Sequence, residues 1–212
     1  MKTPNLGNID AAKKIRAELT WIYVDEVLYR EFARLKENTI PRDVAYKTIM
    51  VDSLYNCNLK MDTWEVATKI IGAKVDAKFD SVEPATLVGE VANIEVQKVG
   101  KRRRTKLGPV FSSKFCHFHC PKRFAIYDQF ADKALGNLLG RQAKFSYAEF
   151  KSSLDKLILE TNLPFKAPYK EIDEYLWLYG QWLDYKDGRH VSTEIKEAIS
   201  RRPELFSRLY PT

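Results

Sequence analysis

The sequence predicts an all-α fold arranged as a helical bundle, and three observations support this prediction. Apolar residues recur at spacings of three to five along most of the chain, as they do on the buried face of an amphipathic helix. Alternation of apolar and polar residues, the pattern of a half-buried strand, is scarce. Of the 212 residues, 45% are hydrophobic, which is sufficient for one substantial core. We expect residues 1–212 to form a single compact helical domain, either undivided or shaped as two lobes around a cleft.

Four helices are expected before residue 98, and most have a recognisable start or end. Pro41 and Pro84 are tolerated in the first turn of a helix, where the missing N–H is not needed. Asp62 or Thr63 can cap the third helix, and Gly72 can end it. The expected ranges are 10–36, 41–56, 62–72 and 82–97. In a two-lobed protein these helices would form most of one lobe.

Six more helices are expected after a loop that is marked by Gly100, Gly108 and Pro109. Their ranges are 112–119, 128–139, 146–161, 170–185, 192–200 and 203–209. Gly180 lies inside one of them and has no side chain, so it allows another backbone or a bound base to come close.

A basic run lies on this loop and accounts for most of the net charge. The formal charge is +7, and the five positive residues of the run leave about +2 for the rest of the chain. These residues are Lys101, Arg102, Arg103, Arg104 and Lys106. Such local basicity is typical of a surface that binds a polyanion. A solvated loop, a nuclear import signal and a contact with anionic lipid are alternatives that the run alone leaves open.

Hydropathy and cysteine usage favour a soluble, cytoplasmic protein. No apolar stretch reaches the ~20 residues needed to span a bilayer, and residues 1–8 lack the apolar core of a signal peptide. The three cysteines, Cys57, Cys116 and Cys120, are an odd number and favour reduced, buried thiols over a disulfide framework. We therefore expect no membrane partner.

Two residues downstream of the basic run are candidates for chemistry. Lys114 is expected in the first turn of the helix 112–119, where the helix dipole disfavours a cation, and an aromatic neighbourhood favours a neutral amine further. Asp128 is expected at a helix N-cap, which would fix the orientation of its carboxylate. A neutral amine is a nucleophile, and a fixed carboxylate can stabilise positive charge on a sugar. A solvated lysine and an ordinary helix cap are the alternatives.

A cluster of cysteine and histidine lies between these two residues. It consists of Cys116, His117, His119 and Cys120. On a helix these positions spread over about 160°, and tetrahedral zinc needs four converging ligands. We therefore expect no metal and no cofactor, and we assign the cluster to packing or to the lining of a pocket.

The segment 111–128, with Lys114 and Asp128 near its ends, resembles the helix-hairpin-helix DNA glycosylases, specifically the short prokaryotic branch related to 8-oxoguanine DNA glycosylase. In that superfamily a lysine opens the helix after the hairpin, and an aspartate caps the next helix after an apolar residue. The segment 47–58 is similar to the buried helix that precedes the lesion pocket, so the resemblance covers roughly residues 44–135. Two features depart from the family. The usual Gly-x-Gly hairpin is replaced here by Leu-Gly-Pro-Val-Phe-Ser-Ser, and the interval of 14 from lysine to aspartate is shorter.

The resemblance implies a glycosylase-like bundle and a DNA glycosylase, with AP lyase activity, that excises an 8-oxoguanine-like lesion or a modified phage base. Such an enzyme flips the damaged nucleotide out of the duplex. Lys114 would attack the sugar C1′ and form a Schiff base, while Asp128 would stabilise the oxocarbenium charge and help to deprotonate the nucleophile. The implied DNA-binding residues are Lys101, Arg102, Arg103, Arg104, Lys106, Ser112 and Ser113. The candidate base-pocket residues are His117, His119, Trp177 and Trp182.

The expected partner is double-stranded DNA with a modified base, bound by a monomer in the nucleoid for repair or phage defence. The rival hypothesis is a non-catalytic helical nucleic-acid-binding protein. In that protein the basic loop would contact phosphates, and Lys114 and Asp128 would be ordinary helix residues.

Overall fold

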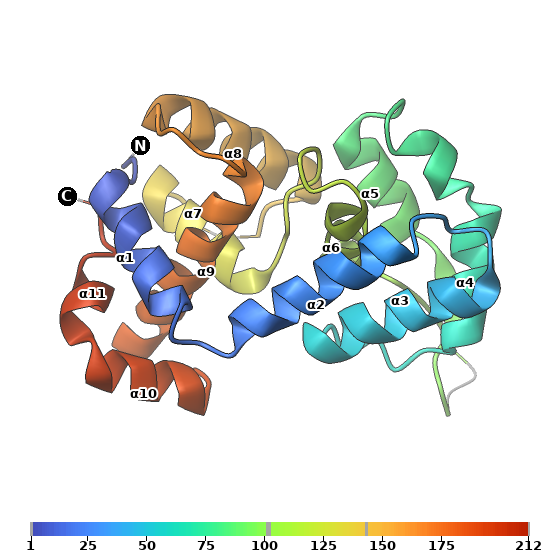
Figure 1. The fold of residues 1–212 in the computed structure, drawn as a ribbon, viewed down its shortest axis with the longest axis horizontal. Helices are drawn as coiled ribbons and strands as arrows, with labels where there is room; N and C mark the ends of the chain where they lie inside the picture. Colours follow the sequence, from blue (N-terminus) through green and yellow to red (C-terminus); the bar gives the residue numbers. More distant parts are fainter. Residues whose placement is uncertain (1, 101–102, 143, 212) are drawn as a thin grey trace. The chain divides into compact units, whose positions relative to one another are not determined.

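The structure is a computed structural model that describes residues 2–100, 103–142 and 144–211, and it confirms the all-α prediction. Within these residues it has eleven α-helices, one short 3₁₀ helix and one two-stranded sheet. The chain folds into two compact units (Figure 1). The first unit combines residues 1–22 with 127–212, and the second is the continuous stretch 23–126.

The first unit is built around one long helix. Its elements are α1 (Leu6–Arg16), α7 (Gln129–Leu139), α8 (Tyr147–Thr161), α9 (Pro168–Lys186), α10 (Thr193–Arg201) and α11 (Pro203–Ser207). The helix α9 packs against both α7 and α1, and its Tyr175, Leu176 and Tyr179 are fully buried. The Tyr179 hydroxyl donates to Asn137 Oδ1 of α7 at 2.7 Å, and the Tyr175 hydroxyl donates to the Leu209 carbonyl at 3.0 Å.

The close approach of α9 to α7 depends on Gly180. A Cβ atom at this position would lie 2.1 Å from the carbonyl oxygen of Phe130, much closer than any real contact. The prediction that Gly180 allows close approach of another backbone is therefore confirmed. Phe130 is the second residue of α7, so α9 makes this contact at the first turn of α7.

The second unit is helical except for a β-hairpin. Its elements are α2 (Trp21–Arg34), which begins at the end of the first unit, α3 (Pro41–Leu54), α4 (Thr63–Gly72), the 3₁₀ helix η1 (Val75–Lys78), α5 (Pro84–Ala92), β1 (Glu95–Gln97), β2 (Arg104–Lys106) and α6 (Pro109–His119). The helix α3 packs on α4 and on α6, and α5 packs on α6. Phe32 of α2 and Phe115 of α6 meet edge to face in the core, with ring centroids 5.7 Å apart.

The hairpin is a feature that the all-helical sequence pattern did not predict. Strands β1 and β2 are antiparallel, with Gln97 opposite Arg104 and Glu95 opposite Lys106. Because successive side chains of a strand point to opposite faces, buried Val96 lies on the inner face, and Arg104 and Lys106 lie on the outer face. The part of the basic run that the structure describes is thus held partly in a strand and not wholly in a loop.

The prediction of one continuous helix over residues 10–36 is wrong. The helix α1 ends at Arg16 and α2 begins at Trp21. Glu194 of α10 accepts hydrogen bonds from the Thr20 backbone N–H at 2.6 Å and from its hydroxyl at 2.8 Å. The first backbone N–H groups of a helix have no partner within the helix. The carboxylate of Glu194, far along the chain, binds the N–H of Thr20 just before α2 and so stabilises the break between α1 and α2.

Two other predicted boundaries differ by three residues or more. The fourth helix ends at Ala92, before the residues that pair as β1, and not at 97. The helix α6 begins at Pro109, which occupies the first helical position, and not at 112. The capping predictions are confirmed: Asp62 caps α4 and Asp128 caps α7 through their side chains.

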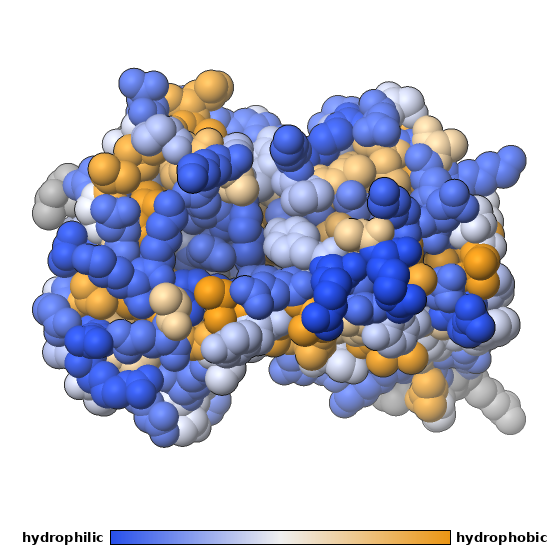
Figure 2. Space-filling view, in the orientation of Figure 1, coloured by the Kyte–Doolittle hydropathy of each residue, from blue (hydrophilic) through white to orange (hydrophobic). Residues whose placement is uncertain are grey.

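Polar side chains cover most of the face shown in Figure 2, with smaller apolar areas among them. Within residues 2–100, 103–142 and 144–211, every helix is too short or too polar to cross a bilayer.

Candidate active site and nucleic-acid interface

Lys114 is a buried lysine whose ammonium lies beside an aromatic ring. The side chain is only 3% exposed, and its Nζ lies 4.9 Å from the centre of the Tyr55 ring. It makes no hydrogen bond or ion pair with any residue that the structure describes. The Lys114 Nζ has no hydrogen-bond partner among the described residues, but it is not fully enclosed, so it can contact solvent. Lys114 is therefore almost fully buried, with its ammonium against an aromatic ring.

The position of Lys114 in its helix differs from the prediction. Since α6 begins at Pro109, Lys114 lies in the second turn and not in the first. The field of a helix dipole falls off within the first turn, so it does not act strongly on this amine. The immediate surroundings of Lys114 therefore decide its chemistry.

A buried carboxylate belongs to the same cluster. The Tyr55 hydroxyl, at the end of α3, donates to Asp25 Oδ1, and Asp25 is a buried residue of α2. One phenol thus separates a buried carboxylate from the Lys114 ammonium. Asp25 and Tyr55 were not predicted as site residues. The sequence did contain a signal for Asp25. This acidic residue is three positions from both Ile22 and Leu28, so it lies on the apolar face of its helix, where a charged side chain is unusual.

His117 lies beside this cluster but is fully enclosed. Its Nδ1 lies 2.7 Å from the Phe124 carbonyl, and its Nε2 lies 2.6 Å from the Tyr29 hydroxyl. Since a carbonyl only accepts, Nδ1 donates to Phe124, and Nε2 is hydrogen-bonded to the Tyr29 hydroxyl. Both ring nitrogens are used within the protein, so His117 is not placed to contact a base in this conformation.

His119 is held in a second aromatic cluster. It stacks on Phe79, with ring centroids 4.8 Å apart, and Phe32 and Phe115 pack around it. Burial lowers the pKa of His119 well below its usual range, and the charge of Lys47 adds to this effect. The neutral imidazole therefore acts as a packing group.

Lys47 of α3 is fully buried, and its ammonium lies at the C-terminal end of α2. Its Nζ donates to the Leu35 carbonyl at 2.8 Å and to the Glu37 carbonyl at 3.2 Å, and it lies 3.4 Å from His119 Nε2. Burial lowers the pKa of Lys47 to about 8, although the charges of Asp76 and Asp43 oppose this shift. These contacts satisfy carbonyls that the helix end leaves open.

All three cysteines are free thiols, but only Cys116 is buried as predicted, whereas Cys57 and Cys120 are partly exposed. Burial raises the pKa of the Cys116 thiol, and burial also raises the pKa of Cys120. In the part of the chain that the structure describes, no three His, Cys, Asp or Glu side chains are grouped so that they could hold a metal ion.

Asp128 is a helix cap, as predicted, in the first unit. Its Oδ1 accepts from the backbone N–H of Phe130 at 2.9 Å and of Ala131 at 2.8 Å. The carboxylate is half-buried and fixed in orientation. Its charge contributes, after burial, to a raised pKa of Asp132 one turn later. Lys114 belongs to the second unit.

The predicted DNA-binding residues fall into three groups. Arg103, Arg104 and Lys106 are exposed on the hairpin, where Arg104 pairs with Glu65 of α4 at 2.5 Å and Lys106 donates to Asn93 Oδ1 at 2.8 Å. Lys101 and Arg102 lie outside the described residues. Ser112 and Ser113 are fully buried in α6, and their hydroxyls donate to the carbonyls of Gly108 and Val110. Neither serine hydroxyl can reach a phosphate in this conformation.

The two tryptophans predicted for a base pocket both lie on α9 in the first unit. Trp177 packs against Trp21 and Phe130, and Trp182 stacks on Tyr185 with ring centroids 5.7 Å apart. These contacts resemble those of ordinary core aromatics at a partly exposed helix face.

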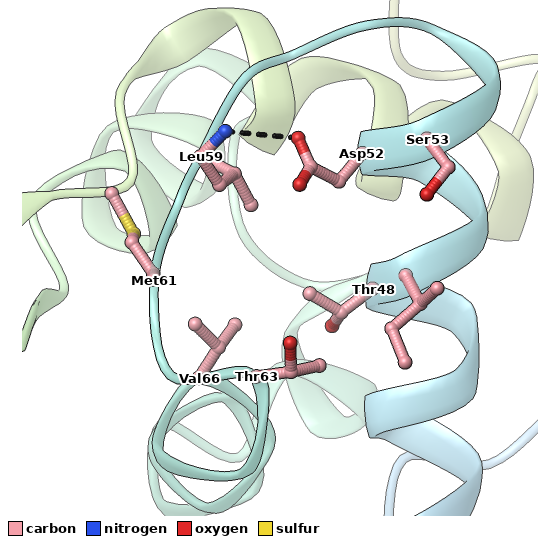
Figure 3. Close-up of a pocket in the computed structure, with 8 residues that line it drawn as sticks. Thr48, Asp52, Ser53, Leu59, Met61, Thr63 and Val66 are labelled. Atoms are coloured by element: carbon pink, nitrogen blue, oxygen red, sulfur yellow. Dashed lines mark hydrogen bonds between the residues drawn. The ribbon is translucent and has the colours of Figure 1, made fainter. Parts of the chain in front are cut away.

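A small pocket of about 180 Å³ lies between α3 and α4 in the second unit. It is lined by Thr48, Ile49, Asp52, Ser53, Leu59, Met61, Thr63 and Val66. Figure 3 shows the Asp52 carboxylate at its wall, where it accepts from the Leu59 backbone N–H at 2.9 Å. The polar groups seen there hold the loop after α3 in place.

A family model described as an N-terminal domain matches residues 8–123, more than half of the chain. The matched region includes Lys114, Asp25 and Tyr55 and ends before Asp128. No curated protein and no solved structure matches the chain.

Proposed function

Because the chain belongs to the HI_0787_N family of N-terminal domains, whose description names no activity, we propose a function from its own residues: a DNA glycosylase with AP lyase activity that excises a modified base. It acts as a monomer on double-stranded DNA in the cytoplasm. The observation that carries this proposal is Lys114, a lysine buried along its length with an ammonium that reaches solvent beside Tyr55. Free surface lysines do not have such surroundings.

The chemistry assigned to Lys114 is nucleophilic. After the ammonium loses a proton, the amine forms a bond to the sugar C1′, and the glycosidic bond breaks with its electron pair leaving on the base. Opening of the sugar ring gives an iminium ion, from which the strand can be cleaved by β-elimination. Tyr55 orders the lysine end sterically, since its ring lies against the ammonium.

Two carboxylates can assist this reaction. Asp25 lies in the same unit as Lys114. Its carboxylate accepts a hydrogen bond from the Tyr55 hydroxyl, and this bond holds Asp25 close to the ring that contacts Lys114. A negative charge there favours the cationic nitrogen that the reaction passes through. Asp128 retains the role that the resemblance implies, namely stabilisation of the oxocarbenium charge by a carboxylate fixed at a helix start.

The test is covalent trapping. Borohydride added to the protein with duplexes carrying an abasic site, 8-oxoguanine or other modified bases should give a protein–DNA adduct at Lys114. Lys114→Met keeps the length of the side chain but removes the amine, and it should abolish the adduct. Lys151→Met, which removes another buried lysine in α8, is the matched control and should keep it. Asp128→Asn should stop base release but leave salt-sensitive DNA binding.

The exposed cations of the hairpin favour a second candidate, a non-catalytic nucleic-acid-binding protein. The same experiment separates the two. DNA binding without any adduct and without abasic product across the panel would reject the enzyme. Product without an adduct would replace the lysine nucleophile with water and leave Asp128 as the essential group.

A further inference from the structure

Trp64 is a large aromatic side chain that the protein leaves uncovered. It is 57% exposed and is the second residue of α4, and its backbone N–H donates to the capping carboxylate of Asp62 at 2.9 Å. No aromatic ring of the described residues contacts the indole. The cap at Asp62 therefore holds the backbone of Trp64 in place, while the indole ring stays exposed.

The residue after Trp64 ties this helix start to the basic hairpin. Glu65 accepts from the Gln97 backbone N–H at 2.6 Å and from the Arg104 guanidinium at 2.5 Å. The Asp62 backbone N–H donates to the Gln97 carbonyl at 3.2 Å. Trp64 and the hairpin are thus parts of one surface, which also includes Lys60, since the Lys60 carbonyl accepts from the Val99 N–H.

Several cations of the hairpin and of the segment before α4 lack an ionic partner among the described residues. Lys60, Lys98 and Arg103 make no side-chain hydrogen bond or ion pair with any described residue, and Lys106 bonds to a neutral amide. Glu65 is balanced by Arg104 and by Lys69. Of these cations, Lys106 lies with Arg104 on the outer face of the hairpin, whereas the alternation of strand side chains places Lys98 and Arg103 on the opposite face.

We infer that the hairpin–α4 surface, formed by Lys60, Trp64, Arg104 and Lys106, binds an unpaired nucleic-acid strand, with Trp64 stacked on a base. The inference extends the DNA binding of the proposed function and rests on it. Exposed cations neutralise phosphates, and an aromatic ring beside them gives a base a stacking platform. In a duplex the faces of the bases are covered by their neighbours, so an indole of this kind contacts a nucleotide that has left the stack.

The experiment measures the affinity of the full-length protein for a labelled deoxythymidine strand of about 15 nucleotides and for a duplex, by fluorescence anisotropy. Trp64→Ala should weaken single-strand binding about 10- to 100-fold and leave the salt dependence unchanged. Trp64→Phe, which keeps a ring, should retain most of the affinity. Tyr23→Ala is the matched control, because Tyr23 is an exposed aromatic residue on α2, 66% accessible, and should bind as the wild type does.

The outcomes test the inference and the proposed function independently of each other. Equal single-strand affinity of Trp64→Ala and wild type, or an equal loss in Tyr23→Ala, would overturn the inference, even if the wild type excises bases. Binding that depends on Trp64 in a protein that forms no adduct and releases no base would support the inference and reject the glycosylase.

Discussion

Substitution of Gly180 by alanine tests the packing that positions α7. The new Cβ would lie 2.1 Å from the Phe130 carbonyl oxygen and 2.6 Å from its carbonyl carbon. Ordinary contact begins at 3.4 Å, so the two helices must separate by about 1.3 Å. The obstacle is backbone and not the end of a flexible side chain, so it cannot rotate away.

The expected loss of stability follows from this displacement. Overpacking of a core costs ~1–3 kcal/mol, and a backbone obstacle places Gly180→Ala near the upper end. Alanine recovers roughly 0.5–1 kcal/mol through its better helix propensity. The free energy of unfolding should therefore fall by about 2–2.5 kcal/mol, which for a chain of this size lowers Tm by roughly 4–10 °C.

Thermal and urea unfolding followed by circular dichroism measure this loss. Gly89→Ala in α5 is the matched control, because nothing lies within 4 Å of its added Cβ, and it should stabilise by up to ~1 kcal/mol. Since Phe130 lies two residues after Asp128, the forced shift also moves the cap, and base release should fall about 100-fold. Unfolding of Gly180→Ala at the wild-type midpoint would refute the packing argument.

Three further predictions concern the second unit. Asp25→Asn keeps the size of the side chain and an acceptor for Tyr55 but removes the charge. The rate of borohydride trapping should therefore fall about 100-fold, and Asp25→Glu should restore part of it. An unchanged rate in Asp25→Asn would contradict the proposed role of this carboxylate. Burial lowers the pKa of Lys47 to about 8 from its ordinary 10.5, so between these pH values the unfolded chain binds more protons and stability rises with pH by up to ~3 kcal/mol. This rise, measured by urea unfolding at each pH, should be missing from Lys47→Met. Ser112→Ala should leave the salt dependence of DNA binding unchanged, because the Ser112 hydroxyl is buried. Lys106→Ser should reduce the slope of log affinity against log salt concentration by about 1. A slope equal to that of the wild type would exclude Lys106 from the interface.

The helices that the sequence predicts well are those with local signals. Asp62 and Asp128 carry their own capping hydrogen bonds, and Gly140 ends α7 in the left-handed conformation that favours glycine. The break between α1 and α2 has no such signal, because the group that supports it, Glu194, lies far along the chain. The hairpin was likewise hidden, because three residues are too few for a recognisable alternation.

The candidate site shows the same division. Lys114 was identified from its sequence neighbourhood, but its contact with Tyr55 and the link to Asp25 join three helices that no local pattern connects. The buried hydroxyls of Ser112 and Ser113 show the opposite error. Small polar residues beside a basic run suggest phosphate contacts, whereas in α6 they bond to carbonyls of their own helix.

The discontinuous first unit has a consequence for biosynthesis. Residues 23–126 are contiguous, so the second unit can fold on the ribosome as soon as it emerges, whereas α1 must wait for α9 and α11 to be translated. The contacts of α1 span most of the chain, and such non-local contacts form slowly. Lys114, Tyr55 and Asp25 would thus be assembled early, whereas α7, which carries the Asp128 cap, would pack on α9 only later.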